Sequence, residues 1–347
     1  MQDAAEIVLS CRQLAQCTAF FAEVGFRLES VFPADDPREA LLSGHGLAIR
    51  LQRGEVDGGG HLRIPGPRRH EMTAPNGTRL QFVTGRPARP AWQPATFFIT
   101  PTTDAPWTEG RVGMLYRNLL QTRQDGSMIA SRIRVPRGGP VPDYVHFHRV
   151  DAQIIYCRSG WVRVVYQDQG GPFVLNAGDC VLQPPGIRHR VLESSDELEV
   201  IEVTSPAEHE TCIDHDLELP TGQIDRDREF GGQRFVRHQA SGAVLQPWSV
   251  AGFDARDTGT ATASRNAIAV RVVRPSAAGV HGTFGHQNDR RLWFVLRGAM
   301  TLTRGKESFR LTTDAACLLP PDTEFGIGEC SGDLEFLEVA RNVRHDP

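Results

Sequence analysis

Short hydrophobic runs separated by glycine and proline dominate the C-terminal two-thirds of the chain. The segments VRVVY at 162–166, VLNAGDCVL at 174–182 and LEVIEV at 198–203 are typical of β-strands bounded by turns. A sustained period of 3.6 residues occurs over 13–24, where apolar residues fall on one face and Gly25 ends the pattern. The pattern predicts a mainly β protein with the strand spacing of a barrel or sandwich, preceded by one amphipathic helix.

Composition shifts at two places and divides the chain into three units. Residues 84–106 are rich in proline and threonine, and are predicted to be a linker or an extended crossing. Residues 205–232 are acidic and rich in turn-forming residues, and are predicted to be a second connection. The expected units are therefore 1–85, 105–205 and 230–343.

The second and third units share one order of elements, which indicates an internal repeat. In each, a strand leads through a loop with glycine or proline to a histidine-containing strand. Two further strands joined by a glycine turn follow, and then a loop with paired prolines. These prolines are Pro184 and Pro185 in one unit, and Pro320 and Pro321 in the other. The repeat predicts two copies of one β-barrel.

Charge and cysteine usage narrow the classes of partner. The 347 residues include 38 lysines and arginines and 42 aspartates and glutamates, which gives a formal net charge of −4. This charge argues against binding to nucleic acid or to anionic membranes. No apolar run approaches the ~18–20 residues of a membrane span, and the first residues lack the pattern of a signal peptide. The seven cysteines are scattered singly, so we expect a cytoplasmic protein without a cysteine zinc site.

Three histidines have the spacing of a metal site. His146 and His148 stand two apart on a predicted strand, so both side chains point to one face. His189 follows a turn that can bring a distant strand back beside the first, and Gln153 begins the next strand. Three neutral imidazoles suit Fe, Mn, Ni, Cu, Co or Zn and leave positions open for water or substrate.

The same segment resembles the two cupin motifs. The first motif is HxH, four residues, an acidic residue, six residues and glycine; the second is G-x5-P-x-G-x2-H. The matching positions are His146, His148, Gly160, Gly178, Pro184, Gly186 and His189. Together with the repeat, the resemblance implies a bicupin: two double-stranded β-helix barrels, with one divalent metal in the first.

Gln153 departs from the motif, which has a glutamate at this position. Glutamine is neutral, and either coordinates through its carbonyl oxygen or only hydrogen-bonds. Three histidines and a neutral group leave a divalent ion at formal +2, which favours an anionic chelating substrate. The substitution also removes a general base from this position.

Three functions are carried forward from this resemblance. Cupins with three-histidine sites include dioxygenases of thiols, β-diketones and gentisate-like phenols, so the leading hypothesis is an Fe(II)-dependent dioxygenase of a small anionic or phenolic substrate. The second is a non-redox isomerase, lyase or cyclase that uses Zn, Ni or Mn, with Co or Cu also open. The third is a small-molecule-binding protein with a structural metal. A homodimer is expected.

Other residues near the first site are weaker candidates. Strand parity from Gln153 places Ile155 and Cys157 inside the same barrel, Cys157 as an apolar filler. Arg132 and Arg134 share one face of the strand that enters the barrel, and either clamp a substrate carboxylate or are solvated. Gln153, Arg132 and Arg134 are therefore the candidates for catalytic roles.

The second copy lacks the ligand set. Phe284, Arg291 and Phe325 stand where the first copy has His146, Gln153 and His189. The favoured interpretation is a structural half that packs against the first barrel. The alternative is an anion pocket formed by Arg291 and His286.

The N-terminal unit is predicted to be a strand over 6–10, a helix over 14–24 and further strands near 26–31, 39–43, 46–52 and 78–83. With Ala19-Phe20-Phe21, Gly25-Phe26 and Pro75-Asn76-Gly77, it resembles one βαβββ module of the glyoxalase, bleomycin-resistance and extradiol-dioxygenase group. In that group the metal ligands lie on the first and last strands, where this chain has Glu6 and Gln81. We therefore expect a degenerate module used for packing, dimerisation or as a lid, with His45, His61 and His70 exposed.

Overall fold

The structure is a computed structural model. It describes residues 5–23, 25–44, 46–55, 58–65, 68–73, 79–83, 96–100, 106–110, 113–120, 126–277, 280–285 and 289–342. The chain forms two compact units. The first consists of Met1–Ala91, Tyr144–Arg149 and Glu208–Leu217, and the second of Trp92–Asp143, Val150–Ala207 and Glu218–Pro347.

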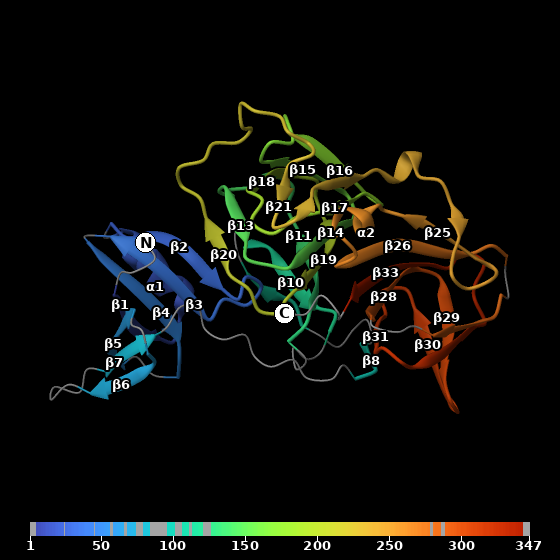
Figure 1. The fold of residues 1–347 in the computed structure, drawn as a ribbon, viewed down its shortest axis with the longest axis horizontal. Coiled ribbons are helices and arrows are strands. Elements are labelled where there is room, and N and C mark those ends of the chain that lie inside the picture. Colours follow the sequence, from blue (N-terminus) through green and yellow to red (C-terminus); the bar gives the residue numbers. More distant parts are fainter. Residues whose placement is uncertain are drawn as a thin grey trace. The chain divides into compact units, whose positions relative to one another are not determined.

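The first unit is one mixed sheet with a helix on one face (Figure 1). Its elements are β1 (Glu6–Cys11), α1 (Leu14–Glu23), β2 (Arg27–Phe32), β3 (Glu39–Gly44), β4 (Leu47–Arg53), β5 (Gly58–Pro65), β6 (His70–Thr73), β7 (Arg79–Val83), β13 (His146–His148) and β20 (Thr211–Ile213). The strand order is β13-β20-β2-β3-β4-β1-β5-β7-β6. The expected strand, helix and four further strands are present as β1, α1, β2, β3, β4 and β7, with β1 parallel to β4, whereas β5 and β6 were not predicted.

The first unit extends beyond the expected segment 1–85 because β20 pairs with β2, Ser30 facing Cys212. Leu14 of α1 packs with Leu42 and Leu51 of the sheet, so the start of the predicted apolar face is buried. Phe20, which the same periodicity places on this face, is exposed. His45 and the expected turn Pro75-Asn76-Gly77 lie outside the described residues.

The second unit contains both halves of the repeat. The first half, called barrel 1, has a large sheet in the order β17-β14-β19-β11-β10-β9 and a smaller group β16-β15-β18 with β12. Its strands are β9 (Thr108–Glu109), β10 (Leu115–Asn118), β11 (Ile129–Val135), β12 (Gly139–Pro140), β14 (Ala152–Ser159), β15 (Trp161–Tyr166), β16 (Phe173–Asn176), β17 (Cys180–Leu182), β18 (His189–Ser194) and β19 (Leu198–Ser205).

The second half, called barrel 2, repeats this topology with sheets β24-β25-β26-β33-β28-β31 and β27-β32-β29-β30. Its elements are β24 (Gln246–Pro247), β25 (Phe253–Asp257), α2 (Thr260–Ala263), β26 (Ile268–Pro275), β27 (Gly282–Gly285), β28 (Asp289–Arg297), β29 (Ala299–Arg304), β30 (Glu307–Thr312), β31 (Ala316–Leu319), β32 (Glu324–Gly328) and β33 (Glu335–Asn342). Between the halves lie β21 (Glu229–Phe230), β22 (Gln233–Arg234), β23 (Val236–His238) and η2 (Ala240–Gly242).

Each barrel borrows an edge strand from the segment that precedes the other. β8 (Phe98–Thr100), which comes before barrel 1 in the chain, pairs with β31 of barrel 2, Ile99 facing Cys317. β23, which comes before barrel 2, pairs with β17 of barrel 1, Arg237 facing Val181. Each borrowed strand covers an otherwise open sheet edge.

Strand alternation separates three cores in the second unit. One face of each large sheet contributes to a shared core between the barrels, which includes Ile154 and Ile201 of barrel 1 and Val270 and Phe294 of barrel 2. The opposite faces line the two barrel interiors. Alternate residues of one strand therefore either hold the barrels together or line a barrel interior.

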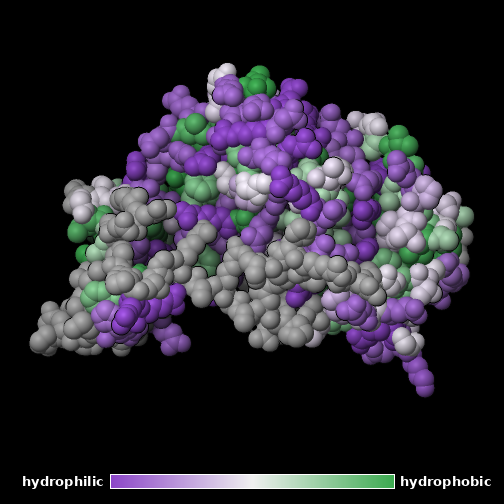
Figure 2. Space-filling view, viewed as in Figure 1, coloured by the Kyte–Doolittle hydropathy of each residue, from purple (hydrophilic) through white to green (hydrophobic). Residues whose placement is uncertain are grey.

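The exposed hydrophobic side chains of the described residues are scattered along the chain. Hydrophilic residues predominate on the visible face in Figure 2, with hydrophobic residues interspersed. The large hydrophobic side chains that are exposed among the described residues, Phe20, Leu47, Ile224 and Val244, lie in separate segments. Within the described part of the chain, no helix has the length and hydropathy needed to cross a bilayer.

Candidate metal centre

The HxH pair forms the short strand β13. His146 and His148 are buried, while Phe147 between them is partly exposed. β13 pairs antiparallel with β20, so that His146 faces Ile213 and His148 faces Thr211. The alternation confirms that both imidazoles point to the same side of the strand.

His189 is the first residue of β18 and follows the turn that contains the paired prolines. The amide of Ile187 donates a hydrogen bond to the carbonyl of Pro184 at 3.2 Å, and Gly186 has a φ of 77°. A residue with a Cβ is strained at this φ, so the motif glycine permits the turn. His189 then faces Tyr166 across the ladder to β15.

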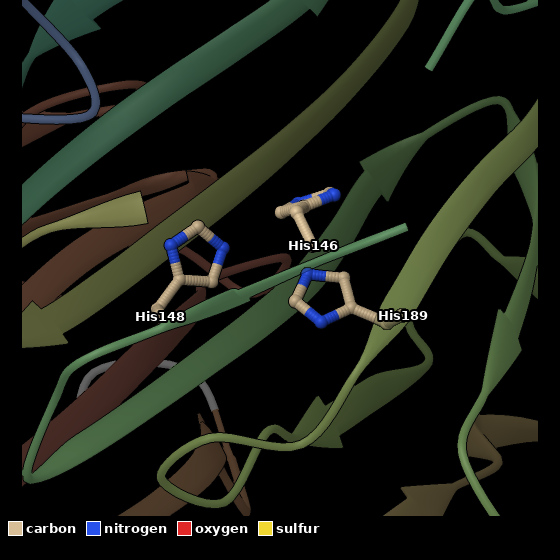
Figure 3. Close-up of side chains that lie close together, drawn as sticks. All are labelled: His146, His148 and His189. Carbon is tan, nitrogen blue, oxygen red and sulfur yellow. The ribbon is translucent and has the colours of Figure 1, made fainter. Parts of the chain in front are cut away.

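The three histidines form one compact cluster of ligand atoms. His146, His148 and His189 each offer a ring nitrogen, and these nitrogens lie within 4.8 Å of one another. Figure 3 shows the three rings gathered around one point. Within the described part of the chain, no other group of three or more His, Cys, Asp or Glu residues meets this criterion.

Hydrogen bonds select the nitrogen that each ring can offer. Nδ1 of His146 lies 2.8 Å from the carbonyl of Tyr144, and Nδ1 of His189 lies 3.1 Å from the carbonyl of Ile187. A carbonyl only accepts, so each Nδ1 carries the proton and Nε2 keeps the lone pair. This is the tautomer that binds a metal through Nε2.

The ring of His148 is held by a side chain and not by a carbonyl. Its Nδ1 lies 2.9 Å from the hydroxyl oxygen of Thr211, which can accept a hydrogen bond. A fourth histidine, His209, has its ring centroid 5.6 Å from that of His148 in an edge-to-face arrangement and is buried. His209 is a lone histidine in a predicted connection, and no motif marks it in the sequence.

The donor set therefore fits a divalent transition metal. Three buried imidazoles bring ring nitrogens within 4.8 Å of one another, and the Nδ1 of each ring lies within hydrogen-bonding distance of an oxygen. A closed structural zinc site has four protein ligands, whereas three leave a position for exchangeable ligands. The chemistry of the donors matches the sequence hypothesis of a three-histidine metal site.

Gln153 lies on the interior face of barrel 1, and its side chain is hydrogen-bonded to a carboxylate. It is 1% exposed, and its Nε2 donates a hydrogen bond to Oε1 of Glu202 at 2.6 Å. Glu202 lies on β19, opposite Ile155. Ile155 and Cys157 belong to the interior core of barrel 1, which confirms the parity prediction for β14.

Sequence reasoning missed Glu202, a polar residue whose side chain contacts one of the motif positions. It lies in the LEVIEV run that was interpreted only as a strand. Its alternation with Val200, an interior residue, was the available signal. The motif position itself thus lacks a carboxylate, but the neighbouring strand supplies one.

Cys157 fills the interior as a protonated thiol. It is fully buried, and this burial, assisted by the charge of Asp179, raises the pKa of the thiol to about 12. A thiol with so high a pKa is a poor nucleophile at neutral pH. The filler interpretation of the sequence analysis is the one that this environment supports.

The structure does not bring Arg132 and Arg134 to the histidines. Both lie on the face of β11 opposite Ile133, which lines the barrel interior. Nη2 of Arg132 is 2.6 Å from Glu199, and Arg134 forms an ion pair with Glu197. Neither a substrate clamp nor simple solvation describes these arginines, because both pair with glutamates that precede or begin β19.

Three other residues of barrel 1 also have local roles. The side chain of Tyr116 is buried in the interior core. Nη1 of Arg188 donates a hydrogen bond to the carbonyl of Gly186 at 3.0 Å, within the turn that leads to His189. Gly160 closes the other motif turn with a φ of 73°, and an added Cβ there would lie 2.3 Å from the hydroxyl of Ser195.

In barrel 2, aromatic side chains occupy two of the positions that hold histidines in barrel 1. Phe284 and Phe325, which correspond to His146 and His189, are buried in the interior core of barrel 2. Arg291, at the position of Gln153, donates to Glu338 at 3.0 Å and pairs with Asp289 at 3.2 Å. His286 lies outside the described residues.

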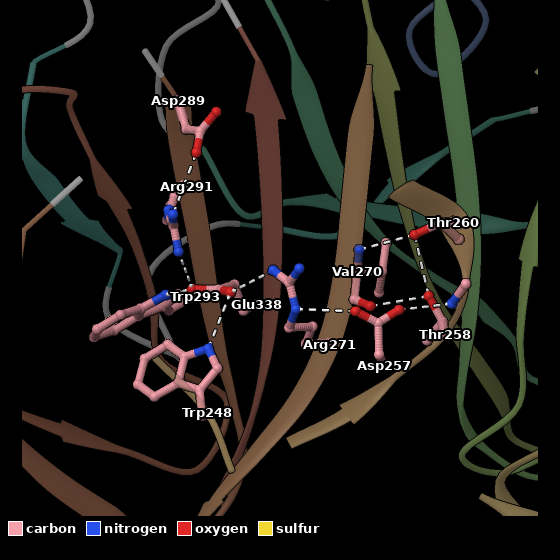
Figure 4. Close-up of polar contacts among 11 residues, drawn as sticks. Trp248, Asp257, Thr258, Thr260, Val270, Arg271, Asp289, Arg291, Trp293 and Glu338 are labelled. Carbon is pink, nitrogen blue, oxygen red and sulfur yellow. Dashed lines mark hydrogen bonds and ion pairs between the residues drawn. The ribbon is translucent and has the colours of Figure 1, made fainter. Parts of the chain in front are cut away.

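Glu338 is the centre of this replacement network (Figure 4). Its side chain is fully buried and accepts hydrogen bonds from both Trp293 and Trp248, at 3.1 and 3.4 Å. Arg271 pairs with the same carboxylate at 3.3 Å. The charge of Arg291 is therefore already balanced inside the barrel, which favours the structural half over an anion pocket.

In the first unit, the side chains of Glu6 and Gln81 form hydrogen bonds with neighbouring side chains. Both oxygens of Glu6 accept hydrogen bonds from Arg50, at 2.8 and 3.2 Å. Nε2 of Gln81 donates to Glu71 at 3.0 Å. A carboxylate held by arginine is a poor metal ligand, which agrees with the interpretation of a degenerate module. His70 is exposed as expected, whereas His61 is partly buried.

Comparison with known proteins supports the fold. Residues 131–204 match the family model of the cupin domain. An oxalate decarboxylase of Lactobacillus farciminis, in complex with formate, is 16% identical with a TM-score of 0.50, covering 70% of this chain and 86% of the other. Oxalate decarboxylase of Bacillus subtilis at pH 4.6 is 14% identical with a TM-score of 0.51, covering 70% and 76%.

None of the curated proteins matches the sequence. At such low identities the structural likeness shows the fold and not the activity. The mainly β cupin fold with bicupin topology is thus confirmed, and it places the three histidines in a cupin domain.

Proposed function

We propose that this chain is a metal-dependent bicupin enzyme whose single divalent transition metal is held by His146, His148 and His189. The observation that carries the proposal is the set of three buried rings, whose offered ring nitrogens lie within 4.8 Å of one another and whose Nδ1 atoms each lie within hydrogen-bonding distance of an oxygen. Gln153 stands at the fourth motif position, as a ligand or as a neighbour of one.

The leading activity is a dioxygenase of a small anionic or phenolic chelating substrate, with Fe(II) as the metal. All groups proposed to touch the ion are neutral, so the ion keeps its full charge for an anionic chelator. When bound, the metal supplies a common binding point for substrate and dioxygen. The residues of the chain orient the ligands and line the interior with buried apolar side chains, such as Val164 and Val200.

A non-redox lyase, isomerase or cyclase is the second candidate, and Glu202 favours it. Such enzymes need a proton acceptor, and the carboxylate of Glu202 lies in hydrogen-bond contact with Gln153. The two solved structures compared above are named as oxalate decarboxylases, and decarboxylases are lyases. Consumption of dioxygen with turnover supports the first candidate, and turnover without it supports the second.

The remaining assignments belong to the same proposal. The first 85 residues would be a degenerate glyoxalase-like module that mediates packing or dimerisation, and the protein would be a cytoplasmic homodimer. Light scattering of the full chain, beside a variant that carries Phe20→Ser on the exposed side of α1, would test the dimer. A monomer in the unmodified protein would refute it.

Elemental analysis of the purified, untagged protein tests the metal centre. We expect close to one transition-metal ion per chain, lost in the His146→Ala/His189→Ala variant. His70→Ala, which changes an exposed histidine, is the matched control and should keep the metal. Absence of metal after reconstitution with Fe(II) would overturn the enzyme proposal and leave a binding module.

A further inference from the structure

In the hydrogen bond between Gln153 and Glu202, the amide is the donor and the carboxylate is the acceptor. Gln153 is almost fully buried, and the 2.6 Å contact joins its Nε2 to a carboxylate oxygen of Glu202. An ionised carboxylate only accepts hydrogen bonds, so the amide nitrogen of Gln153 must point to Glu202. The carbonyl oxygen Oε1 is then turned away from Glu202, which settles the orientation of the amide on chemical grounds.

The pair is linked to His189 through Tyr166. The Tyr166 ring stacks on the imidazole of His189, with centroids 5.4 Å apart. Tyr166 belongs to the interior core of barrel 1, together with Cys157 of β14 and Val200 of β19. Because side chains alternate along a strand, Gln153 and Glu202 lie on the same interior faces as Cys157 and Val200, so the pair and the Tyr166–His189 stack share one barrel interior.

Barrel 2 has a hydrogen-bonded pair at the positions that correspond to Gln153 and Glu202. The final strands read LEVIEV in barrel 1 and LEFLEV in barrel 2, so Glu338 corresponds to Glu202. Glu338 accepts a hydrogen bond from Arg291, which stands at the position of Gln153. In both barrels an inward glutamate on the last strand is the acceptor for the side chain at the acidic position of the motif.

We propose that Glu202 is the positioning residue of the metal centre. By holding Nε2 of Gln153, it presents Oε1 to the three-histidine site as a neutral fourth ligand. This inference rests on the proposed function, since it requires that the three histidines bind a metal.

A double-variant cycle tests whether Glu202 acts through Gln153. The four proteins are the unmodified chain, Glu202→Gln, Gln153→Ala and the combination of both. Co(II) is the probe, because its visible absorption reports ligand number and geometry, and its affinity is measured by competition with a chromophoric chelator. Glu193→Gln is the matched control, since Glu193 pairs with Arg163 on the outside of the same barrel.

We expect Glu202→Gln to weaken Co(II) binding by about 10- to 100-fold and to change the absorption spectrum. In the Gln153→Ala background the same substitution should change the affinity less than about twofold, since nothing is left to position. Glu193→Gln should behave as the unmodified protein. An unchanged affinity and spectrum in Glu202→Gln, or an equal loss in both backgrounds, would overturn the inference.

The exchange variant Gln153→Glu/Glu202→Gln keeps the result interpretable if a single variant folds poorly. It preserves the charge and the hydrogen bond with donor and acceptor reversed, so it should bind Co(II) within about threefold of the unmodified protein or more tightly. Loss of binding in this folded variant would count against the inference. Failure of the unmodified protein to bind Co(II) would instead overturn the proposed function itself.

Discussion

The ring of Tyr166 lies nearly parallel to the imidazole of His189, with centroids 5.4 Å apart and planes inclined by 23°. The two residues are directly opposite each other on β15 and β18. Phe235 packs against Tyr166 at 4.6 Å, so the stack is supported from a further segment. This arrangement limits the orientations open to the His189 ring.

The stack predicts that the aromatic ring of Tyr166, and not its hydroxyl, supports metal binding. Tyr166→Phe should leave Co(II) affinity within about threefold, whereas Tyr166→Leu should weaken it about 10-fold because His189 loses its packing partner. Metal titration of both variants checks this. Equal losses in Phe and Leu variants would show that the hydroxyl matters instead.

A second prediction concerns the hydroxyl that orients His148. Thr211→Val keeps the shape of the side chain but removes the oxygen that lies 2.9 Å from Nδ1. We expect metal affinity to fall by about 10- to 100-fold with little change in fold. Thr211→Ser retains the hydroxyl and should bind nearly as the unmodified protein. Normal affinity in the valine variant would remove Thr211 from the metal centre.

A third prediction separates the roles of the two barrels. Arg291→Met removes one of the two arginines that balance the fully buried Glu338. Leaving this charge undercompensated should lower the free energy of unfolding by about 3–5 kcal/mol. The metal content of the folded protein should not change, since the ligands lie in the other half of the repeat. Urea denaturation and elemental analysis together test this, and a loss of metal would contradict the structural role of barrel 2.

A fourth prediction follows from Cys157. The thiol has an ordinary pKa of 9.0, which burial raises to about 12 in the folded protein. The unfolded state therefore releases this proton first as the pH rises, so the stabilising contribution is complete below about pH 9 and is lost between about pH 9 and 12. Within this window the thiol reduces the free energy of unfolding by up to ~1.4 kcal/mol per pH unit.

Denaturation at pH 8.0, 9.5 and 10.5 measures this slope. Cys157→Ala should be less stable at pH 8.0 but should lose stability less steeply above pH 9, because one titrating group is gone. Arg134→Gln, which changes an exposed ion pair, is a control that should keep the original slope. Identical slopes in the cysteine variant and the unmodified chain would show that Cys157 does not titrate in this range.

The sequence was sufficient to predict the three-histidine cluster because its signals are local. His146 and His148 are linked by strand alternation, and His189 by a turn whose glycine needs a positive φ. Strand alternation likewise placed Ile155 and Cys157 in the interior. These inferences need only the periodicity of two and the chemistry of turns.

The sequence was insufficient wherever a role depends on a distant partner. Arg132 and Arg134 were correctly placed on one face of their strand, but the glutamates that pair with them come from more than 60 residues later in the chain. Glu202 was hidden for the same reason, since its contact with Gln153 spans two strands. Side-chain partners of this kind are set by strand register, which the local pattern does not specify.

The borrowed edge strands make the two halves of the repeat interdependent. A fragment that ends before β23 would expose the edge of β17, and one that begins after β8 would expose the edge of β31. Each fragment would therefore present unpaired backbone groups that favour association with other chains. Although barrel 2 lacks the three-histidine set, it cannot be discarded, because its Val270 and Phe294 cover the apolar face of the sheet on which Gln153 and Glu202 lie.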